Sequence, residues 1–159
     1  MQKITIVTVG RLREGYLREA AAEYQKRLSA YCSVEVIETE QVSLPERAAV
    51  VEIDKALESE GKTLLKRLPQ NRLNVALCIE GRRVDSEGFA RLIKGSAQDH
   101  SGINFIIGGS YGLSDDVKRA ADVRLSMSDM TFPHHLARIM LLEQIYRAYK
   151  INEGGKYHK

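Results

Sequence analysis

Cysteine, proline and tryptophan are scarce in this chain of 159 residues, which contains two cysteines, three prolines and no tryptophan. Cys32 and Cys78 form no Cys-x-x-Cys pair, so we expect neither a disulfide nor a zinc site. Cys78 lies in an apolar run, where a thiol usually fills the core. No stretch approaches the ~18 apolar residues of a membrane span, and residues 1–10 lack a signal-peptide pattern. These absences favour a cytoplasmic protein with no membrane segment and no bound metal.

Charge is distributed unevenly along the chain. The net charge of +3 arises in residues 133–159, with five Lys and Arg against two Asp and Glu, because residues 1–132 carry nineteen of each. A basic terminus can attract the phosphates of a nucleic acid. A solvated tail whose cations suit a helix dipole explains the same pattern equally well. With 43% hydrophobic and 28% charged residues, the chain 1–159 is predicted to form one globular domain.

Strand and helix patterns alternate from one end of the chain to the other. The predicted strands are residues 4–9, 34–37, 73–79, 104–107 and 123–126. The predicted helices run from Leu17 to Tyr31, from Pro45 to Leu68, from a cap at Asp85 or Ser86, from Ser114 to Ala121, and from Pro133 to about Asn152. This alternation predicts an α/β fold whose mainly parallel sheet of about five to six strands has helices on both faces.

Three of these elements carry more specific expectations. We expect Gly81 to end the third strand, and the second helix to bury a stripe of Val50, Ile53, Leu57, Leu64 and Leu68. The last helix is apolar around more than one face, through Leu136, Ile139, Met140, Leu141, Leu142, Ile145, Tyr146 and Tyr149. A helix covered on two sides needs a second partner, for which another copy of the chain is favoured. A deeply buried central helix is the alternative.

Two loops directly follow the fourth and fifth strands. The first is the glycine-rich segment 108–112, and the second runs from Ser126 to His135. Glycine lets a ligand approach the main chain, and ligands of parallel sheets bind beyond the carboxyl ends of the strands. The loops therefore predict a small-molecule site made mainly of peptide groups. Segment 108–112 lacks the Gly-x-Gly-x-x-Gly spacing of a nicotinamide site, and the adjacent His134 and His135 have poor metal-binding geometry.

The chain closes on two glycines followed by Lys156, Tyr157, His158 and Lys159. Tyr157 could stack on a base, His158 could move a proton, and the lysines could meet phosphate. A frayed terminus is the simpler interpretation of the same composition.

Several segments together match one family pattern. They are Ile4 to Gly10, Ile107 to Leu113, Leu125 to His134, Arg138, Glu143 to Ala148, and Tyr157 to Lys159. Over nearly its whole length, the chain thus resembles the RlmH family, which are small SPOUT-class methyltransferases that modify pseudouridine in 23S ribosomal RNA. The resemblance implies a SPOUT fold with a C-terminal trefoil knot, S-adenosylmethionine as cofactor, a homodimer, and methylation of N3 of a pseudouridine without a metal. Because a protein this small offers little surface for reading a sequence, we expect it to recognise the assembled ribosome instead of isolated RNA.

The resemblance also assigns residues to the cofactor. It implies that the cofactor is held chiefly through backbone groups and apolar contact with adenine by Leu77, Gly108, Met127, Ser128, Asp129, Met130, Thr131 and Phe132. One departure from the pattern is visible, because the family often has an acidic residue after Leu77. This chain has Cys78 there, with Glu80 two positions later.

The candidates for catalysis are Arg138, His134, Tyr157 and His158. Arg138 would stabilise negative charge on the uracil oxygens or grip a phosphate, because its planar fork suits either role. His134 and His158 would handle the proton, Tyr157 would stack on the base, and the tail would complete a site on the neighbouring subunit. Two other functions are consistent with the sequence: a non-catalytic RNA-binding or ribosome-assembly module, and a SPOUT enzyme acting on transfer RNA.

Overall fold

A five-stranded parallel sheet forms the centre of the protein. In the computed structural model, which describes residues 1–158, the strand order is β2-β1-β4-β3-β5 and every neighbouring pair is parallel. The strands are β1 (Gln2–Val9), β2 (Cys32–Thr39), β3 (Leu73–Arg83), β4 (Gly102–Ile107) and β5 (Val123–Ser126). The helices are α1 (Gly15–Leu28), α2 (Val50–Arg67), α3 (Ser86–Asp99), α4 (Asp115–Ala120) and α5 (His134–Asn152). Lys159, one of the two tail lysines predicted to meet phosphate, lies outside the described residues.

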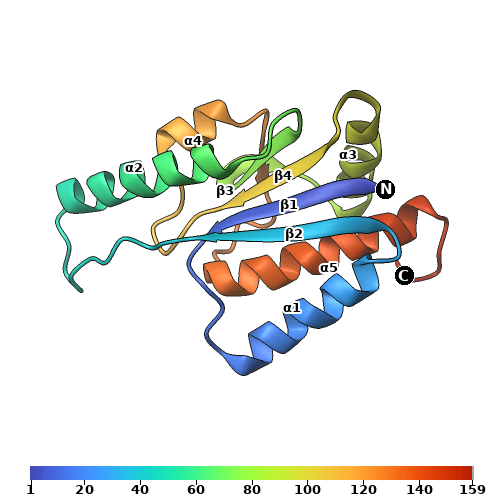
Figure 1. Ribbon diagram of the computed structural model, residues 1–159, viewed down its shortest axis with the longest axis horizontal. Coiled ribbons are helices and arrows are strands. Elements are labelled where there is room, and N and C mark those ends of the chain that lie inside the picture. The colour runs from blue at the N-terminus through green and yellow to red at the C-terminus, as the bar shows by residue number, and fades with distance from the viewer. Residues whose placement is uncertain (159) are drawn as a thin grey trace.

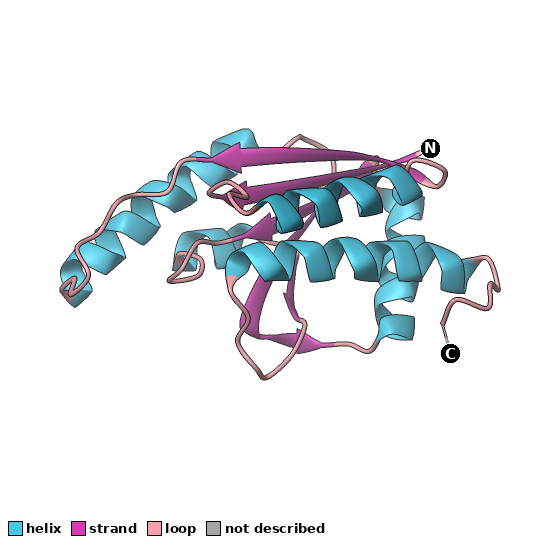
Figure 2. Ribbon diagram, turned by 90° about the horizontal axis from the view of Figure 1, so that it is seen from below, coloured by secondary structure: helices cyan, strands magenta, loops and turns pink. Residues whose placement is uncertain are grey.

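Helices cover both faces of the sheet (Figures 1 and 2). α1, α3 and α5 lie on one face, and α2 and α4 lie on the other. Strands that are buried on both faces consist almost entirely of apolar and β-branched residues. Residues 4–9 of β1 and all of β4 are buried in this way. The predicted α/β fold is confirmed, while the trefoil knot stays an implication of the resemblance.

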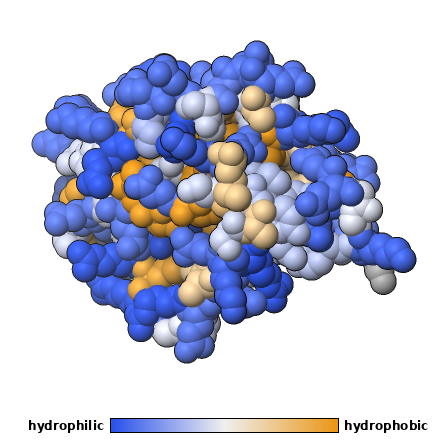
Figure 3. All heavy atoms as spheres, turned by 45° about the vertical axis from the view of Figure 1, so that its right-hand side comes forward, coloured by the Kyte–Doolittle hydropathy of each residue, from blue (hydrophilic) through white to orange (hydrophobic). Residues whose placement is uncertain are grey.

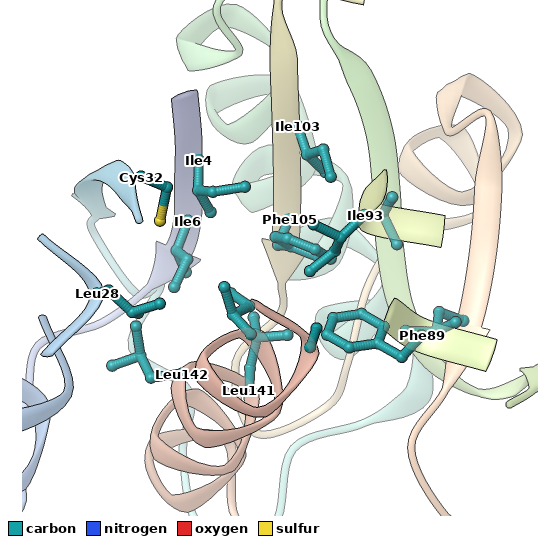
Figure 4. Close-up of a cluster of buried hydrophobic side chains, with 14 of the residues drawn as sticks. Ile4, Ile6, Leu28, Cys32, Phe89, Ile93, Ile103, Phe105, Leu141 and Leu142 are labelled. Atoms are coloured by element: carbon teal, nitrogen blue, oxygen red, sulfur yellow. The ribbon is translucent and has the colours of Figure 1, made fainter. Parts of the chain in front are cut away.

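The larger core lies between the sheet and α5 (Figure 4). Ile6 of β1 and Phe105 of β4 face Leu141 and Leu142 of α5. Phe89 of α3 packs against Phe105, with ring centroids 5.8 Å apart. Each fully buried side chain of this size stabilises the fold by ~1.5–3 kcal/mol relative to an exposed one. The core thereby holds α5 against the sheet, with the first turn of the helix at the carboxyl edge of the strands (Figure 1).

Two predicted helix caps are present. The Asp85 carboxylate accepts a hydrogen bond from the Gly88 N–H (2.7 Å), and the Ser114 hydroxyl accepts one from the Val117 N–H (3.3 Å). These side chains satisfy N–H groups that have no partner within the first helical turn. The last helix ends at Asn152, as predicted.

The second helix differs from the prediction in its start and in its buried face. α2 begins at Val50, and residues 45–49 form a loop, so the prediction that Pro45 opens the helix is wrong. Its fully buried residues are Ala56, Glu60, Gly61 and Leu64, whereas Val50 is 73% exposed. The face is rotated from the predicted stripe because Gly61, which has no side chain, lets α2 pack closely against Ser114 and Val117.

The third strand is longer than predicted. β3 continues to Arg83, so Gly81 does not end it. The register of β3 on β5 shifts between Leu77 and Arg82, which marks an irregularity of the bulge type. A Cβ at Gly81 would lie 2.7 Å from the backbone nitrogen of Leu125. Gly81 therefore lets the strand bend closely past β5 instead of terminating it.

The apolar surface of α5 is largely covered within the chain. Leu141, Leu142, Ile145 and Ala148 are buried beneath the sheet and against α1 and α3. Leu136, by contrast, is 40% exposed. The central-helix alternative thus accounts for most of this surface, and the homodimer stays a prediction.

The surface is mostly hydrophilic, and hydrophobic residues appear in separate patches on the face shown in Figure 3. Among the large hydrophobic side chains that are exposed, Ile79, Tyr111 and Met130 line the cavity described below. Within residues 1–158, no helix has both the length and the apolar character needed to cross a membrane.

Candidate functional site

The carboxyl ends of β4 and β5 and the middle of β3 between them line one cavity. Its volume is about 830 Å³, within the ~300–1,000 Å³ typical of ligand pockets. The lining comes mainly from the middle of β3, the turn after β4 and the loop after β5: Leu77 to Glu80, Ile107 to Leu113, Lys118, Leu125 to Ser128, Met130 to His135, and Ala137. The convergence predicted from the order of strands and loops is present.

Most residues proposed for cofactor binding line this cavity. They are Leu77, Gly108, Met127, Ser128, Met130, Thr131 and Phe132. Asp129 is the exception, because it is not among the lining residues and its carboxylate pairs with Arg83 (2.5 Å). The loop is braced by its own serines. The Ser126 hydroxyl donates to the Ser128 carbonyl (3.1 Å), and the Met130 N–H donates to the Ser128 hydroxyl (3.0 Å).

The glycine-rich segment forms a tight turn against the cavity. The Gly112 N–H donates to the Gly109 carbonyl (3.1 Å), and Gly112 has a φ of +84°. A Cβ at Gly108 would collide with the Gly112 carbonyl. Glycine is therefore required by the turn itself, which presents peptide groups to the cavity.

The composition of the cavity suits a nucleoside-containing donor. Leu77, Ile107, Leu125 and Phe132 are apolar lining residues, and Ser110, Ser126 and Ser128 are polar ones. Ligand pockets commonly combine an apolar lining with a few placed polar groups. The residues present therefore fit S-adenosylmethionine, the cofactor that the resemblance implies.

The departure at Cys78 has a structural counterpart. Cys78 lines the cavity and is only partly buried, so the prediction that it fills the core is wrong. Glu80 also lines the cavity, and its carboxylate pairs with Lys118. The hydrogen bond from Lys118 lowers the pKa of Glu80. This chain therefore does place a carboxylate at the cavity, two positions later than the family pattern.

Two adjacent histidines belong to the cavity wall. The rings of His134 and His135 have centroids 3.9 Å apart, and both residues line the cavity. His134 Nε2 and His135 Nδ1 are buried and have no hydrogen-bond partner within residues 1–158. Burial, followed by the neighbouring His135 and Arg138, lowers the pKa of His134 below its ordinary 6.5. Burial likewise lowers the pKa of His135.

Arg138 lies one turn further along α5 and is only 4% exposed. Its Nη1 donates to Glu38 Oε2 (2.9 Å), and its Nη2 donates to the Gly10 carbonyl (3.1 Å). The guanidinium therefore joins α5 to the ends of β1 and β2. Nη1 and Nη2 thus face the protein's own carboxylate and backbone, while Nε is buried without a partner within residues 1–158.

The C-terminal tail lies away from the cavity. The Tyr157 hydroxyl donates to Glu143 (3.0 Å), and the guanidinium of Arg147 lies 4.8 Å from the centroid of the Tyr157 ring. Arg147 also donates to His158 Nδ1 (3.3 Å). Glu143 is about 13 Å further along α5 than His134, at 1.5 Å per residue. Of the four proposed catalytic residues, only His134 lines the cavity of its own chain.

Sequence reasoning did not single out Glu38 or Gly10 as residues of the site. Glu38 is a hundred positions from its partner Arg138, so no local pattern connects them. Gly10 follows a buried strand as Gly108 does, and that shared position is a signal that could have identified it. Nowhere in the part of the chain that the structure describes do three or more His, Cys, Asp or Glu side chains gather in a way that could hold a metal ion.

Known proteins resemble this chain closely in sequence. A family model described as "Predicted SPOUT methyltransferase" matches residues 2–158. A protein named "Ribosomal RNA large subunit methyltransferase H" from Clostridioides difficile (strain 630) is 47% identical over 157 residues, which are 98% of this chain and 99% of that protein. A protein of the same name from Streptococcus gordonii is 44% identical over 158 residues, which are 99% of each chain.

Solved structures share the fold at much lower sequence identity. A probable methyltransferase from Bordetella pertussis Tohama I has a TM-score of 0.56 at 15% identity, over 92% of this chain and 96% of that chain. A probable methylase family protein from Haemophilus influenzae Rd KW20 has a TM-score of 0.55 at 15% identity, over 98% of this chain and 70% of that chain. These two likenesses concern the fold alone. The family match and the full-length relatives confirm the resemblance drawn from the sequence, and the chain belongs to the SPOUT methyltransferase family.

Proposed function

We propose that this protein transfers a methyl group from S-adenosylmethionine to N3 of a pseudouridine in 23S ribosomal RNA, and that it acts as a cytoplasmic homodimer on the assembled ribosome. One observation carries the proposal: the cavity formed by β3 and the loops after β4 and β5 is lined by a histidine that has a buried ring nitrogen without a partner in residues 1–158 and a lowered pKa. The names of the full-length relatives support ribosomal RNA as the substrate class.

Residues of the cavity would hold the methyl donor. When bound, S-adenosylmethionine supplies a methyl group on a positively charged sulfur. Leu77, Gly108 and the loop 127–132, with Asp129 bracing the loop through Arg83, would hold it. Holding two reactants in a near-attack geometry can supply ~7–11 kcal/mol of the barrier, so positioning is the main contribution of these residues.

His134 is the proposed proton acceptor. The imide nitrogen of the target base carries a proton that must leave as the nitrogen gains a methyl group. A neutral imidazole accepts such a proton, and the lowered pKa keeps His134 neutral near pH 7. His134 Nε2 is buried and has no partner among residues 1–158, so the base would reach it only after the ring or the residues that cover it move.

Arg138 is proposed as a positioning residue. Its bonds to Glu38 and Gly10 support the strand ends beside His134, and its buried guanidinium has little surface left for a substrate. Tyr157 and His158 are proposed to act in the site of the partner subunit, because within their own chain they contact Glu143 and Arg147. There Tyr157 would stack on the base, and His158 would assist the proton transfer.

The test combines donor binding with product analysis. Calorimetric titration of the protein with S-adenosylmethionine should show saturable binding near one site per chain. Incubation with ribosomes from cells lacking the protein should add N3-methylpseudouridine to 23S ribosomal RNA, as read by mass spectrometry, with little transfer to protein-free RNA. His134→Ala should lower kcat about 10²–10⁴-fold while donor binding is kept.

His100→Ala is the matched control, because His100 also has a buried, unpartnered ring nitrogen but lies at the end of α3, away from the cavity. Its activity should equal that of the unmodified protein. Absence of donor binding would favour the non-catalytic module instead. Methyl transfer to transfer RNA in place of ribosomal RNA would favour the third function.

A further inference from the structure

A second hollow adjoins the donor cavity on the side of β1 and β2. Its volume is about 860 Å³. It is lined by residues 10–13, Arg18, residues 38–41, Ser110, His134 and His135. Ser110, His134 and His135 line both spaces, so the two share a wall at the histidines.

The loop between β1 and α1, residues 10–14, forms one wall of this hollow and is held from several directions. Gly10 has a φ of +87°, and its N–H donates to the Thr39 carbonyl (2.8 Å). Arg138 donates to the Gly10 carbonyl (3.1 Å). Arg18 donates to the carbonyls of Leu12 (3.4 Å) and Arg13 (2.5 Å). The loop is therefore organised before any ligand arrives.

The charge of the hollow is predominantly positive. Arg11 and Arg13 are exposed, and neither is engaged in an ion pair within residues 1–158. Two carboxylates line the same space. Glu38 is neutralised by Arg138, which leaves Glu40 alone against Arg11, Arg13 and Arg18.

We propose that Arg11 and Arg13 bind the phosphodiester backbone beside the target nucleotide. Guanidinium groups match phosphate oxygens in charge and in their paired donors. A strand whose phosphates lie in the second hollow can place its base at His134, because the histidines separate this hollow from the donor cavity. This inference rests on the proposed function and names the surface that holds its RNA.

The test removes the two charges and measures the salt dependence of binding. Each phosphate contact contributes about −0.7 to −0.9 to the slope of log affinity against log salt. In the variant Arg11→Gln/Arg13→Gln, which removes two contacts, the slope measured for ribosomes should therefore be less steep by about 1.4–1.8. Its KM for ribosomes should rise about tenfold at low salt, with kcat within about twofold. Arg11→Lys/Arg13→Lys should keep most of the slope, because it keeps both charges.

Lys66→Gln/Arg67→Gln is the matched control. Both residues are exposed at the end of α2, which leads into the amino end of β3 at the opposite edge of the sheet. This variant should bind ribosomes with the slope and KM of the unmodified protein.

Donor titration separates this inference from the proposed function. The arginine variant should bind S-adenosylmethionine as the unmodified protein does. If the arginine variant has the salt slope and KM of the unmodified protein, the inference is wrong. The proposed function still stands in that case, provided that the unmodified protein transfers the methyl group. Loss of donor affinity in the arginine variant would also overturn the inference, because the arginines would then support the donor cavity. Failure of the unmodified protein to bind donor or to methylate RNA would instead defeat the proposed function.

Discussion

His134 and Arg138 stand about one helical turn apart in α5, and their surroundings suit them to different roles. His134 lines the cavity, its Nε2 is buried without a partner within residues 1–158, and burial lowers its pKa. Arg138 is buried and already donates to Glu38 and Gly10. At this scale, we propose proton transfer for the histidine and support of the surrounding strand ends for the arginine.

The lowered pKa values of His134 and His135 predict a pH dependence of stability. Because both folded-state pKa values lie below the ordinary 6.5, the unfolded chain binds more protons than the folded chain as the pH falls below that value. Their contribution to the free energy of unfolding is therefore present above pH 6.5 and is lost as the pH falls through the folded-state values. Urea unfolding at about pH 7.5 and about pH 5.5 should show this loss.

The comparison that isolates the histidines is the variant His134→Gln/His135→Gln. It should lose less stability between the two pH values than the unmodified protein does, because glutamine does not titrate. Equal losses in the two proteins would contradict the prediction.

Among the elements, β3 decides the shape of the donor cavity. Leu77 to Glu80 line the cavity just before the strand bends at Gly81 and continues along β5. The bend depends on close contact between Gly81 and the backbone of Leu125. The same strand therefore contributes the cavity wall before the bend and the partner of β5 after it.

Gly81→Ala should disturb both parts of β3. A Cβ there meets backbone atoms that cannot rotate away, so the free energy of unfolding should fall by about 1–3 kcal/mol. Affinity for S-adenosylmethionine should fall as well, because Leu125 also lines the cavity. Urea unfolding and calorimetric titration measure the two effects.

Gly95→Ala is the control for that substitution. Gly95 lies in α3, and apart from the backbone of its own helix, no atom lies within 4 Å of a Cβ built there. Alanine should raise the stability by about 0.5–1 kcal/mol, because it favours the helix. A Gly81→Ala protein as stable as Gly95→Ala would show that the bend tolerates a side chain.

At the scale of the whole molecule, the position of the C-terminal tail bears on whether each active site is built from one chain or from two. Tyr157 and His158 contact the middle of α5 in their own chain, while His134 lies at its start. A homodimer in which each tail enters the partner's site reconciles the proposed roles of these residues. Light scattering should then give twice the 17.9 kDa mass of one chain.

Mixing two inactive variants tests the exchange of tails. One variant ends after Gly155 and keeps His134, and the other carries His134→Ala and keeps its tail. If tails act across the dimer, each mixed dimer has one complete site, so an equimolar mixture that exchanges subunits freely should recover about a quarter of the unmodified activity. Refolding the two variants together ensures exchange, and methyl transfer to ribosomes is the readout.

Each variant alone, refolded in the same way, provides the baseline for that experiment. Mixed dimers can be verified with a tag on one variant only. If verified mixed dimers have no activity above the baseline, the tail does not act across the interface.

The strands, caps and cavity loops follow from local patterns. The apolar run Ile4 to Val9, the caps Asp85 and Ser114, and the glycines after β4 each signal their structure within a few residues. Hydrophobic periodicity and helix capping depend on residues that are close together along the chain, so both can be recognised in the sequence. For the same reason, the meeting of two loops at one sheet edge could be predicted once the strands were parallel.

Contacts between distant segments decided the rest. Gly61 turned the buried face of α2 toward Ser114, Gly81 bent β3 past β5, and Glu38 paired with Arg138. Asp129 turned to Arg83, and the arginines after β1 came to lie beside the histidines of α5. Spacing along the chain specifies which elements form, whereas close packing and charge pairing between them settle which side chains face the site, because those energies exist only after the elements have met.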